Sequence, residues 1–311
     1  MNFTENKCDW CGSSRYSVIF QGKDLLMGKP GTFQFVECSQ CGLLRQNPRL
    51  NWDELSAYYE DGYSPHAHQV DEKKRSKGES FIDRYGLWKR VKFVSKNKSS
   101  GKWLDVGCGN GRILQEASRW QNWELVGLEP IEEVAHYTKE KLNIPVYPYT
   151  FEQLDVSEDN KFDIITMWDV LEHLPSPMQS FERVSNLLND NGVFIFSIPN
   201  YQSIDRKIFN KYWIGYDLPR HLYVYPHDIL RKMLENVGMR LVKSKCIAGT
   251  HAAFFLSLNF YNQAAQSKIL GHVLKKGDRY TPWKVLTFLP FWVIDKLKLS
   301  TNITFVAKKI G

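Results

Sequence analysis

The chain has 311 residues, of which 43% are hydrophobic and 24% are charged, and its formal net charge is +7. This composition is ordinary for a folded globular protein and argues against an intrinsically disordered chain. No apolar run approaches the ~20 residues that a membrane-spanning helix needs, so an integral membrane protein is not expected.

The first fifty residues contain four of the six cysteines, arranged as two Cys-x-x-Cys pairs: Cys8 with Cys11, and Cys38 with Cys41. A glycine follows each pair directly and permits a tight turn around a metal. The first seven residues are polar and do not form a signal peptide, so we expect a cytoplasmic protein with reduced thiols. Residues 1–50 are therefore predicted to form a structural Zn²⁺ module with four thiolate ligands. Two unmetallated pairs are the alternative.

Residues 51–100 are predicted to form a mostly helical connecting segment. Residues 71–102, which overlap the end of this segment, hold eleven Lys or Arg and four Asp or Glu, and this excess of seven positive charges equals the whole net charge. Such a basic face could attract phosphates, a nucleotide-linked substrate, nucleic acid or anionic lipid, or it could simply be a solvated helix face. The spacing of Phe81, Tyr85, Trp88, Val91 and Val94 is that of a buried helical stripe.

Residues 101–248 alternate strand and helix patterns, which predicts an α/β fold with a Rossmann-like, doubly wound parallel sheet. The predicted strands are Lys102–Val106, Glu124–Leu128, Val146–Tyr149, Phe162–Trp168, Val193–Ile198 and Leu241–Ile247. The helical patterns are Gly111–Trp120, a helix with Pro130 as its first residue, Met178–Leu188, and Ile229–Val237 with Gly238 as its C-cap. Ligands of such sheets bind at the carboxyl ends of the strands.

The strongest single motif is the glycine-rich turn after the first of these strands, with Asp105 before Gly107, Gly109 and Gly111. The glycines supply positive φ angles and let the backbone approach a ligand closely. A nicotinamide-binding turn would read G-x-G-x-x-G, whereas this turn reads G-x-G-x-G. Glu129 ends the second strand about 20 residues further on, where a carboxylate can accept hydrogen bonds from both hydroxyls of a ribose.

The remaining segment, residues 249–311, is predicted to be an aromatic-rich, irregular insertion over 249–300, followed by one last strand over 301–307. No function can be assigned to this insertion from its residues.

The middle of the chain resembles class I S-adenosylmethionine-dependent methyltransferases. The resemblance is carried by residues 104–111 (Leu-Asp-Val-Gly-Cys-Gly-Asn-Gly), 127–130 (Gly-Leu-Glu-Pro), 162–174 and 192–199, and it covers roughly residues 81–248 plus the last strand. It implies S-adenosylmethionine as cofactor. By the pattern of that family, Gly107, Cys108 and Gly109 line the methionine part, Glu129 holds the ribose, Thr150 and Phe151 lie near the adenine, and Asp169 lies near the methionyl end. Cys108 is then a lining residue and not a nucleophile.

Two further segments, residues 37–50 and 213–223, are similar to bacterial methyltransferases that act on sugars and surface polysaccharides. This resemblance implies O- or C-methylation of a sugar or sugar-linked small molecule. We expect the 200–225 loop to form one wall of the acceptor pocket, with His221 as the first candidate for the catalytic base and His173 as the second. Arg220 is a candidate ligand for a phosphate or carboxylate of the acceptor.

Other functions stay open at this point. An RNA methyltransferase could dock through the basic stretch and the zinc module, although we expect no nucleic-acid partner and at most peripheral contact with a membrane. A cofactor-binding scaffold without activity is the non-enzymatic alternative. Asp169, Glu172 and His173 together could bind Mg²⁺ or Mn²⁺. The acceptor atom and the oligomeric state are not encoded in any motif.

Overall fold

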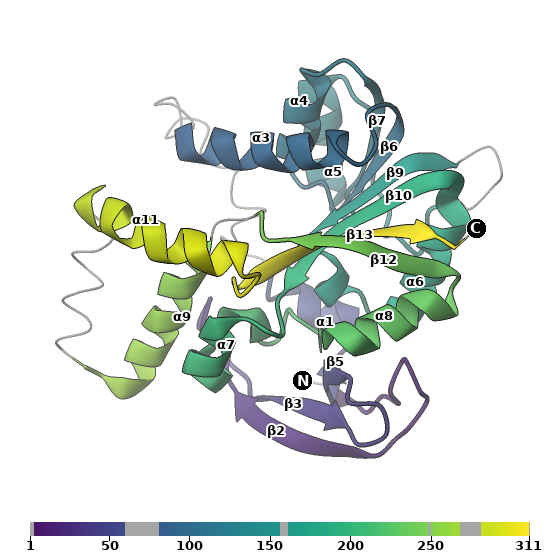
Figure 1. Ribbon diagram of the computed structural model, residues 1–311. Coiled ribbons are helices and arrows are strands. Elements are labelled where there is room, and N and C mark those ends of the chain that lie inside the picture. The colour runs from purple at the N-terminus through teal and green to yellow at the C-terminus, as the bar shows by residue number, and fades with distance from the viewer. Residues whose placement is uncertain (1–2, 60–80, 156–160, 248–249, 268–280, 311) are drawn as a thin grey trace. The chain divides into compact units, whose positions relative to one another are not determined.

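The structure is a computed structural model, and it describes residues 3–59, 81–155, 161–247, 250–267 and 281–310 (Figure 1). Residues 71–80 of the predicted basic stretch lie outside the described residues. The chain forms two compact units, each drawn from several stretches of the sequence, whereas the sequence pattern divides it linearly. Unit 1 comprises residues 1–58, 198–229 and 245–304, and unit 2 comprises residues 59–197, 230–244 and 305–311.

Unit 2 is built on the seven-stranded sheet, whose strand order is β12-β13-β10-β9-β6-β7-β8. Its strands are β6 (Gly101–Val106), β7 (Trp123–Leu128), β8 (Val146–Tyr147), β9 (Phe162–Trp168), β10 (Leu188–Pro199), β12 (Met239–Lys245) and β13 (Asn302–Lys309). The pairs β6–β7, β7–β8, β6–β9 and β9–β10 are all parallel. The order reverses between β6 and β9, which is the point where ligands bind in folds of this kind. The predicted Rossmann-like α/β fold is confirmed.

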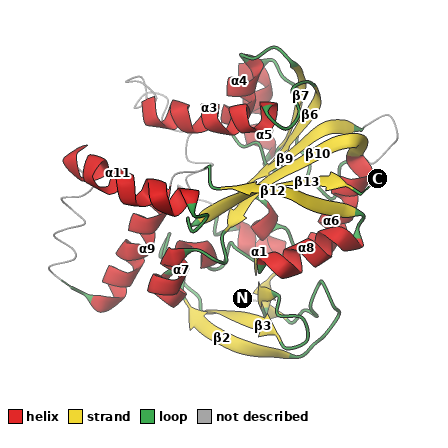
Figure 2. Cartoon of the chain, viewed as in Figure 1, coloured by secondary structure: helices red, strands yellow, loops and turns green. Residues whose placement is uncertain are grey.

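Helices connect these strands in the order that the sequence predicts: α3 (Phe81–Ser95), α4 (Arg112–Ser118), α5 (Glu132–Leu142), the short 3-10 helix η3 (Leu171–His173), α6 (Pro177–Leu187) and α8 (His227–Asn236). Figure 2 shows α3, α4 and α5 gathered beside β6 and β7. The prediction that Pro130 is the first helical residue is wrong, because α5 begins at Glu132 and has Ile131 as its N-cap. The Ile131 amide donates instead to the Glu129 carboxylate, at 3.1 Å, and this bond keeps the turn outside the helix.

The two central strands of unit 2 are buried on both faces, as continuous apolar runs predict. Trp103 and Leu104 of β6 and Ile164 and Ile165 of β9 are fully inaccessible to solvent. The cross-strand partners Trp103–Ile164 and Leu104–Ile165 stack these side chains in register. The glycine turn and Asp169, which directly follow β6 and β9, therefore extend from a pair of buried, well-packed strands.

The buried stripe of α3 differs from the prediction. Val91 and Val94 are buried, but Tyr85 is 49% exposed and stacks on Trp88 with ring centroids 5.7 Å apart. Lys89 lies over the Tyr85 ring and Lys92 lies over the Trp88 ring, at 5.2 and 4.2 Å. An aromatic side chain can be exposed in this way because the attraction of a cation to the ring face offsets part of the free energy lost by not burying the ring.

Unit 1 contains a four-stranded antiparallel sheet with the order β11-β4-β3-β2. Its strands are β2 (Tyr16–Gly22), β3 (Phe33–Cys38), β4 (Leu44–Gln46) and β11 (Tyr223–Val224), and β1 (Phe3–Thr4) pairs with β5 (Arg49–Leu50) beside them. The helical elements of this unit are α1 (Trp52–Ser56), α7 (Ile204–Phe209), the 3-10 helices η4 (Asn210–Tyr212) and η5 (Ile214–Tyr216), α9 (Thr250–Ala265) and α11 (Thr281–Lys296). The 200–225 loop thus supplies one strand to the sheet of the cysteine module.

The prediction that the insertion is irregular is wrong, because α9 and α11 occupy most of it. Its aromatic side chains pack the two helices together. Phe254 of α9 lies edge-on to Phe291 of α11, with ring centroids 5.3 Å apart. None of the helices in the described ranges is long and apolar enough to cross a membrane.

A buried ion cluster joins distant parts of unit 1. The Arg220 guanidinium is fully buried and makes two hydrogen bonds to Asp217, at 2.7 and 2.9 Å, and two to Asp24, at 2.7 and 3.2 Å. It also donates to the carbonyl of Tyr58 at 3.2 Å. Burial works to lower the pKa of Arg220, but the bonds to the carboxylates outweigh it and raise this pKa. Two carboxylates and one guanidinium thereby hold the loop after β2 against the 200–225 loop.

We expect Arg220→Met to lower the free energy of unfolding by about 3–5 kcal/mol, because the substitution leaves two buried carboxylates without their cation. Urea denaturation of the purified protein measures this change. Arg231→Met, which removes an exposed arginine from α8, is the control and should stay within about 0.5 kcal/mol of the wild type. Equal stability of Arg220→Met and the wild type would contradict the assigned role of the cluster.

Candidate functional site

The glycine-rich turn after β6 folds its backbone onto the end of β7. Gly107 and Cys108 both donate from their amides to the carbonyl of Leu128, at 2.7 and 3.0 Å. Gly107, Gly109 and Gly111 have φ angles of +67°, +53° and +73°, as the motif predicts. A Cβ on Gly107 would stand 2.7 Å from Val170, so a larger residue cannot take this conformation without moving its neighbour.

Glu129 lies where the sequence places it, directly after β7. Its carboxylate accepts one hydrogen bond from the Gly109 amide at 3.0 Å and one from the Ile131 amide at 3.1 Å. Burial raises the pKa of Glu129, and the two backbone amides act in the opposite direction. A carboxylate has about four acceptor positions, and the two amides use two of them. The other two can accept hydrogen bonds from further donors, such as the hydroxyls of a ribose.

Asp105 is buried inside the strand that leads to the turn. It accepts a hydrogen bond from the Thr166 hydroxyl at 2.5 Å, and this hydroxyl also accepts one from the Trp103 indole at 2.8 Å. Burial raises the pKa of Asp105 to about 7, although the bond from Thr166 lowers it. Asp105 therefore supports the turn from beneath and carries less negative charge near neutral pH than an exposed aspartate does.

Asp169 follows β9 and has a φ of +57°, which is unusual for a residue with a side chain. Its backbone amide donates to the Ser197 carbonyl at 3.2 Å, and the Ser197 hydroxyl donates to its carboxylate at 2.9 Å. Arg90 of α3 forms an ion pair with the same carboxylate at 3.8 Å. Three contacts from two neighbouring elements thus hold the Asp169 carboxylate at the end of β9.

The other predicted cofactor residues lie in the same unit. Cys108 is buried, and burial together with Asp105 and Glu129 raises the pKa of its thiol well above the ordinary value, which agrees with a lining residue. Thr150 and Phe151 follow β8, the neighbour of β7 in the sheet. The Thr150 amide donates to the Gln153 side chain at 2.9 Å, and Phe151 is buried.

The two candidate bases are both hydrogen-bonded. His173, in η3 of unit 2, contacts the Tyr59 hydroxyl through Nδ1 at 3.0 Å. His221, in unit 1, contacts the Gly215 carbonyl through Nδ1 at 2.9 Å. A carbonyl only accepts, so Nδ1 of His221 carries the proton, and Nε2 is the proton-accepting nitrogen of the neutral ring.

The predicted cation site at Asp169, Glu172 and His173 is not formed. Within the part of the chain that the structure describes, Asp169 belongs to no group of three or more metal-binding side chains whose ligand atoms lie within 4.8 Å of one another. The Asp169 carboxylate contacts Ser197 and Arg90 instead.

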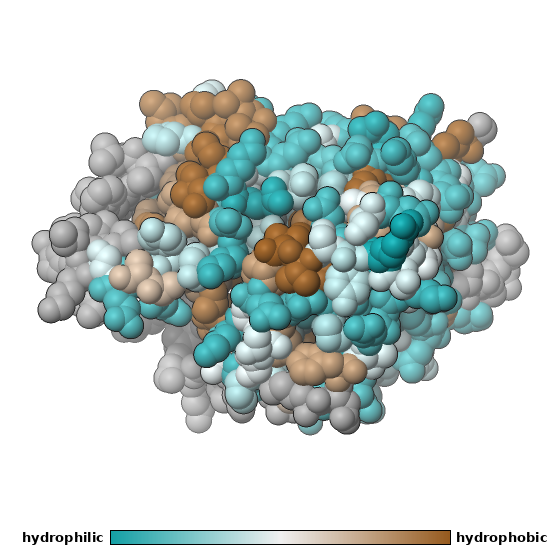
Figure 3. Space-filling view, turned by 90° about the horizontal axis from the view of Figure 1, so that it is seen from below, coloured by the Kyte–Doolittle hydropathy of each residue, from teal (hydrophilic) through white to brown (hydrophobic). Residues whose placement is uncertain are grey.

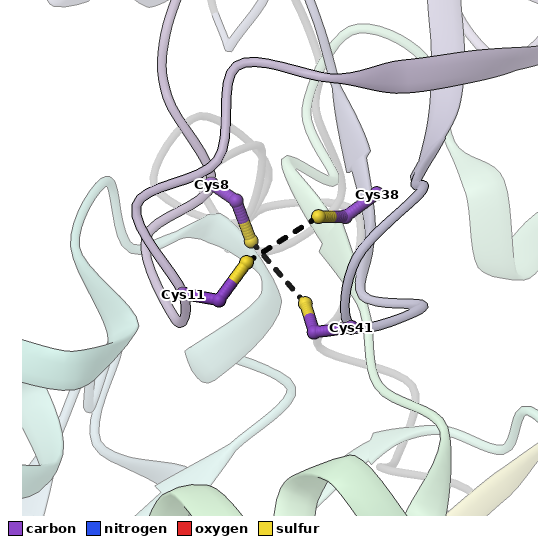
Figure 4. A group of neighbouring side chains, drawn as sticks. All are labelled: Cys8, Cys11, Cys38 and Cys41. Atoms are coloured by element: carbon purple, nitrogen blue, oxygen red, sulfur yellow. Dashed lines mark hydrogen bonds between the residues drawn. The ribbon is translucent and has the colours of Figure 1, made fainter.

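The four paired cysteines of unit 1 meet in one cluster, with their sulfur atoms within 4.8 Å of one another (Figure 4). Cys8 Sγ lies 3.5 Å from Cys41 Sγ, and Cys11 Sγ lies 3.5 Å from Cys38 Sγ. These distances are far too long for disulfides, and four sulfurs bound tetrahedrally to Zn²⁺ at ~2.3 Å would lie about 3.8 Å apart. The geometry and the donor set therefore fit Zn²⁺.

Local backbone bonds shape this cluster. The amide of the glycine after each pair donates to the carbonyl of the first cysteine: Gly12 to Cys8, and Gly42 to Cys38, each at 2.8 Å. Both glycines have positive φ angles of +70° and +78°. Burial works to raise the pKa of Cys38, but hydrogen bonds from backbone amides, that of Cys41 first, lower it to about 7.

The proposed role of Arg220 as a ligand of the acceptor is wrong, because its guanidinium is buried and already bound to Asp24 and Asp217. A cleft of about 310 Å³ lies in the same unit, and Asp217 is one of the residues that line it. Its lining combines aromatic side chains with two lysines, and includes Tyr212, Trp213, Tyr216, Phe260, Lys23 and Lys211. Sequence analysis missed Asp24, Lys23 and Phe260, since nothing in their local sequence links them to the 200–225 loop.

Comparison with known proteins identifies the family. Residues 79–244, more than half of the chain, match the family described as a methyltransferase domain. The protein therefore belongs to this methyltransferase-domain family. The match covers the glycine turn, Glu129, Asp169 and His173.

Individual relatives match only part of the chain, at moderate identity. A ubiquinone biosynthesis O-methyltransferase of Histophilus somni is 37% identical over 108 residues, which are 32% of this chain and 45% of that protein. The one from Coxiella burnetii is 29% identical over 175 residues, covering 52% and 73%. The chain thus spans about half the length of several curated relatives that it matches. A solved S-adenosylmethionine-dependent methyltransferase from Clostridium acetobutylicum is 15% identical, with a TM-score of 0.47 and coverage of 81% and 100%.

Two glycines of unit 2 give a direct test of the close packing around the turn. Gly111 and Gly238 share a φ of +73°, but a Cβ on Gly111 would lie 2.5 Å from both Leu142 and Thr138, whereas one on Gly238 would meet nothing within 4 Å. Each alanine variant bears the ~1–2 kcal/mol cost of the left-handed conformation. We expect Gly111→Ala to lose a further ~1–3 kcal/mol in urea denaturation, because its packing is tight. Equal losses in both variants would contradict this packing.

Proposed function

We propose that this protein transfers the methyl group of S-adenosylmethionine to a hydroxyl group of a small, ring-bearing acceptor. The observation that carries the proposal is the Glu129 carboxylate, which two backbone amides hold at the carboxyl end of β7, against the glycine turn. In S-adenosylmethionine the methyl group is bonded to a positively charged sulfur. The acceptor oxygen would form a bond to the methyl carbon as the carbon–sulfur bond breaks, and S-adenosylhomocysteine would leave. The work of the protein is then to place the acceptor in line with that methyl group.

The residues of unit 2 fit this cofactor chemically. Glu129 would accept hydrogen bonds from the ribose hydroxyls, and the backbone of Gly107, Cys108 and Gly109 would face the methionine part. Asp169 would offer a negative charge to the methionyl end, because Ser197 and Arg90 fix its carboxylate. Thr150 and Phe151, at the end of the neighbouring strand, would flank the adenine.

A hydroxyl acceptor benefits from a base, typically by 10²–10⁴-fold in rate. His221 suits this role because its bond to the Gly215 carbonyl fixes the tautomer in which Nε2 accepts a proton. For His173 the partner is a hydroxyl, which can donate or accept, so the tautomer is not fixed. His221 is therefore our first candidate and His173 our second.

The cleft of unit 1 supports an acceptor that carries a ring and a negative charge. Tyr212, which is partly exposed, offers a ring on which a sugar or an aromatic ring can stack, and Lys23 and Lys211 offer cations for a phosphate. This mixture favours a phosphorylated or nucleotide-linked sugar. The names of the curated relatives favour O-methylation and suggest an intermediate of ubiquinone biosynthesis as the competing acceptor. Tighter binding of a water-soluble ubiquinone analogue than of a sugar phosphate, measured with S-adenosylhomocysteine present, would favour that competitor.

An RNA acceptor is a second candidate, because α3 presents Tyr85, Trp88, Lys89 and Lys92 together. Aromatic rings and cations in alternation suit single-stranded nucleic acid. RNA binding that weakens steeply with salt and that Lys92→Ala reduces would favour this candidate; its absence would remove it.

We also propose that Cys8, Cys11, Cys38 and Cys41 bind one structural Zn²⁺. Four thiolates leave no open position for a substrate, so such an ion stabilises the fold and takes no part in the reaction. The ion would tie the segment before β2 to the turn between β3 and β4.

Glu129→Gln should weaken binding of S-adenosylhomocysteine about 10- to 150-fold, because a charged acceptor of hydrogen bonds contributes ~1.5–3 kcal/mol. Isothermal titration calorimetry measures the change. Glu124→Gln, on the exposed side of the same strand, is the matched control and should bind like the wild type. The ribose assignment fails if the two variants bind equally well.

Freshly purified, reduced protein should contain one Zn²⁺ per chain by elemental analysis, and Cys38→Ser should contain much less. Cys246→Ser, which removes a buried cysteine outside the cluster, should keep its zinc. We expect chelation to lower the melting temperature of the wild type, because the ion crosslinks two segments of unit 1. Less than half an equivalent of zinc in the wild type would refute this site.

A further inference from the structure

Helices α9 and α11 form an insertion between β12 and β13 that the proposed reaction does not use. The sequence of α9 contains no Asp, Glu, Lys or Arg over its 16 residues, and α11 contains only Lys284, Asp295 and Lys296. Surface helices of globular proteins usually carry a charged face, so a pair of helices with so little charge needs an apolar partner on more than one side.

The two sides of α11 differ in their surroundings. Phe291 points toward α9, where it packs on His251 and Phe254 with ring centroids 5.3 Å away in each case. The opposite side exposes Leu289 (64%), Trp292 (47%), Val293 (42%) and Leu297 (62%), which we call the α11 outer face. Their spacing of three, four and eight residues puts them in one stripe of the helix and its end.

Single exposed apolar residues are normal, but a stripe of four on one helix marks an interaction surface. Apolar side chains are not spread evenly over the protein: on the face shown in Figure 3 they gather in separate patches between hydrophilic ones. The outer face of α11 is such a patch, defined by four large side chains.

Positive charge lies at the C-terminal end of this patch. Lys296 lies over the Trp292 ring, with Nζ 5.3 Å from its centroid, and Lys298 is exposed two residues further on. In the sequence, residues 246–301 hold seven Lys or Arg and only two Asp or Glu. Lysine stems lie along apolar surface while their ammonium groups reach out to water or phosphate, and tryptophan prefers the boundary between apolar and polar layers.

We propose that the α11 outer face docks this protein onto a bilayer that contains anionic lipids. Leu289, Trp292, Val293 and Leu297 enter the boundary between headgroups and acyl chains, while Lys296 and Lys298 contact the lipid phosphates. The docking is peripheral, since no helix among the described residues can span a membrane. This inference goes beyond the proposed function and does not rest on it.

The same observations argue against two other occupants. A second copy of the chain would bring Lys296 and Lys298 near their own like charges, and the exposed positions of 289–298 include no Asp or Glu to pair with them. Nucleic acid would meet the cations, but Leu289, Val293 and Leu297 would then stay in water, because aliphatic side chains do not stack on bases as rings do.

The test is cosedimentation of the full-length, zinc-loaded protein with vesicles of phosphatidylcholine alone or of phosphatidylcholine with phosphatidylglycerol. We expect binding to the anionic vesicles, weaker binding at high salt, and little binding to phosphatidylcholine. Trp292→Glu should weaken binding by about 10-fold or more, because a charge enters the boundary layer. Trp292→Phe should retain most of it.

Val242→Glu is the matched control, because it puts the same charge on another exposed apolar residue, on β12. It should bind vesicles like the wild type, and circular dichroism should show all variants folded. Three results would overturn the proposal: no binding of the wild type to anionic vesicles, equal binding by Trp292→Glu, or a dimer in sedimentation equilibrium that Trp292→Glu dissociates.

Discussion

The interaction on which the site depends is the contact of the glycine turn with the end of β7. Gly107 and Cys108 share the Leu128 carbonyl, and the Gly109 amide binds the Glu129 carboxylate at 3.0 Å. These bonds form only because the turn has positive φ angles and no side chains in the way. These bonds fix the positions of the start of α4, of Glu129 and of the ends of β6 and β7. Glu129 also binds the Ile131 amide just before α5, so one carboxylate contacts both the glycine turn and the segment that leads into α5.

Unit 1 is held together by a different principle. Its sheet takes strands from both the N-terminal module and the 200–225 loop, and its buried cluster joins Asp24 to Arg220 across nearly two hundred residues of sequence. Moving a guanidinium and two carboxylates out of water costs much free energy, so the intact cluster adds little to the free energy of unfolding. Removing one of its members is strongly destabilising, because the remaining buried charges then lack a partner. The cysteine cluster belongs to the same unit. The loop that bears His221 therefore depends on the N-terminal module for its conformation, and the two cannot be treated as independent parts.

Much of unit 2 could be predicted from the sequence. β9 has the predicted bounds, and β6 and β7 differ from prediction by one residue at one end, because continuous apolar runs ended by glycine or acidic residues have few other interpretations. The helices of the insertion could not be predicted, because α9 and α11 lack the polar face on which helical periodicity is recognised. Tyr85 was assigned to the core on spacing alone, and spacing does not reveal that Lys89 lies over its ring. Arg220 was assigned to the acceptor from its place on the 200–225 loop, and the sequence could not reveal its ion cluster because its partner Asp24 is remote in sequence.

The central claim is that the glycine turn and Glu129 of unit 2 are arranged for S-adenosylmethionine and not for a dinucleotide. Calorimetric titration of the zinc-loaded wild type with S-adenosylmethionine and, separately, with NAD tests this most directly. The account predicts saturable one-to-one binding of S-adenosylmethionine that S-adenosylhomocysteine displaces, and no measurable binding of NAD. Tight binding of NAD without binding of S-adenosylmethionine would contradict it.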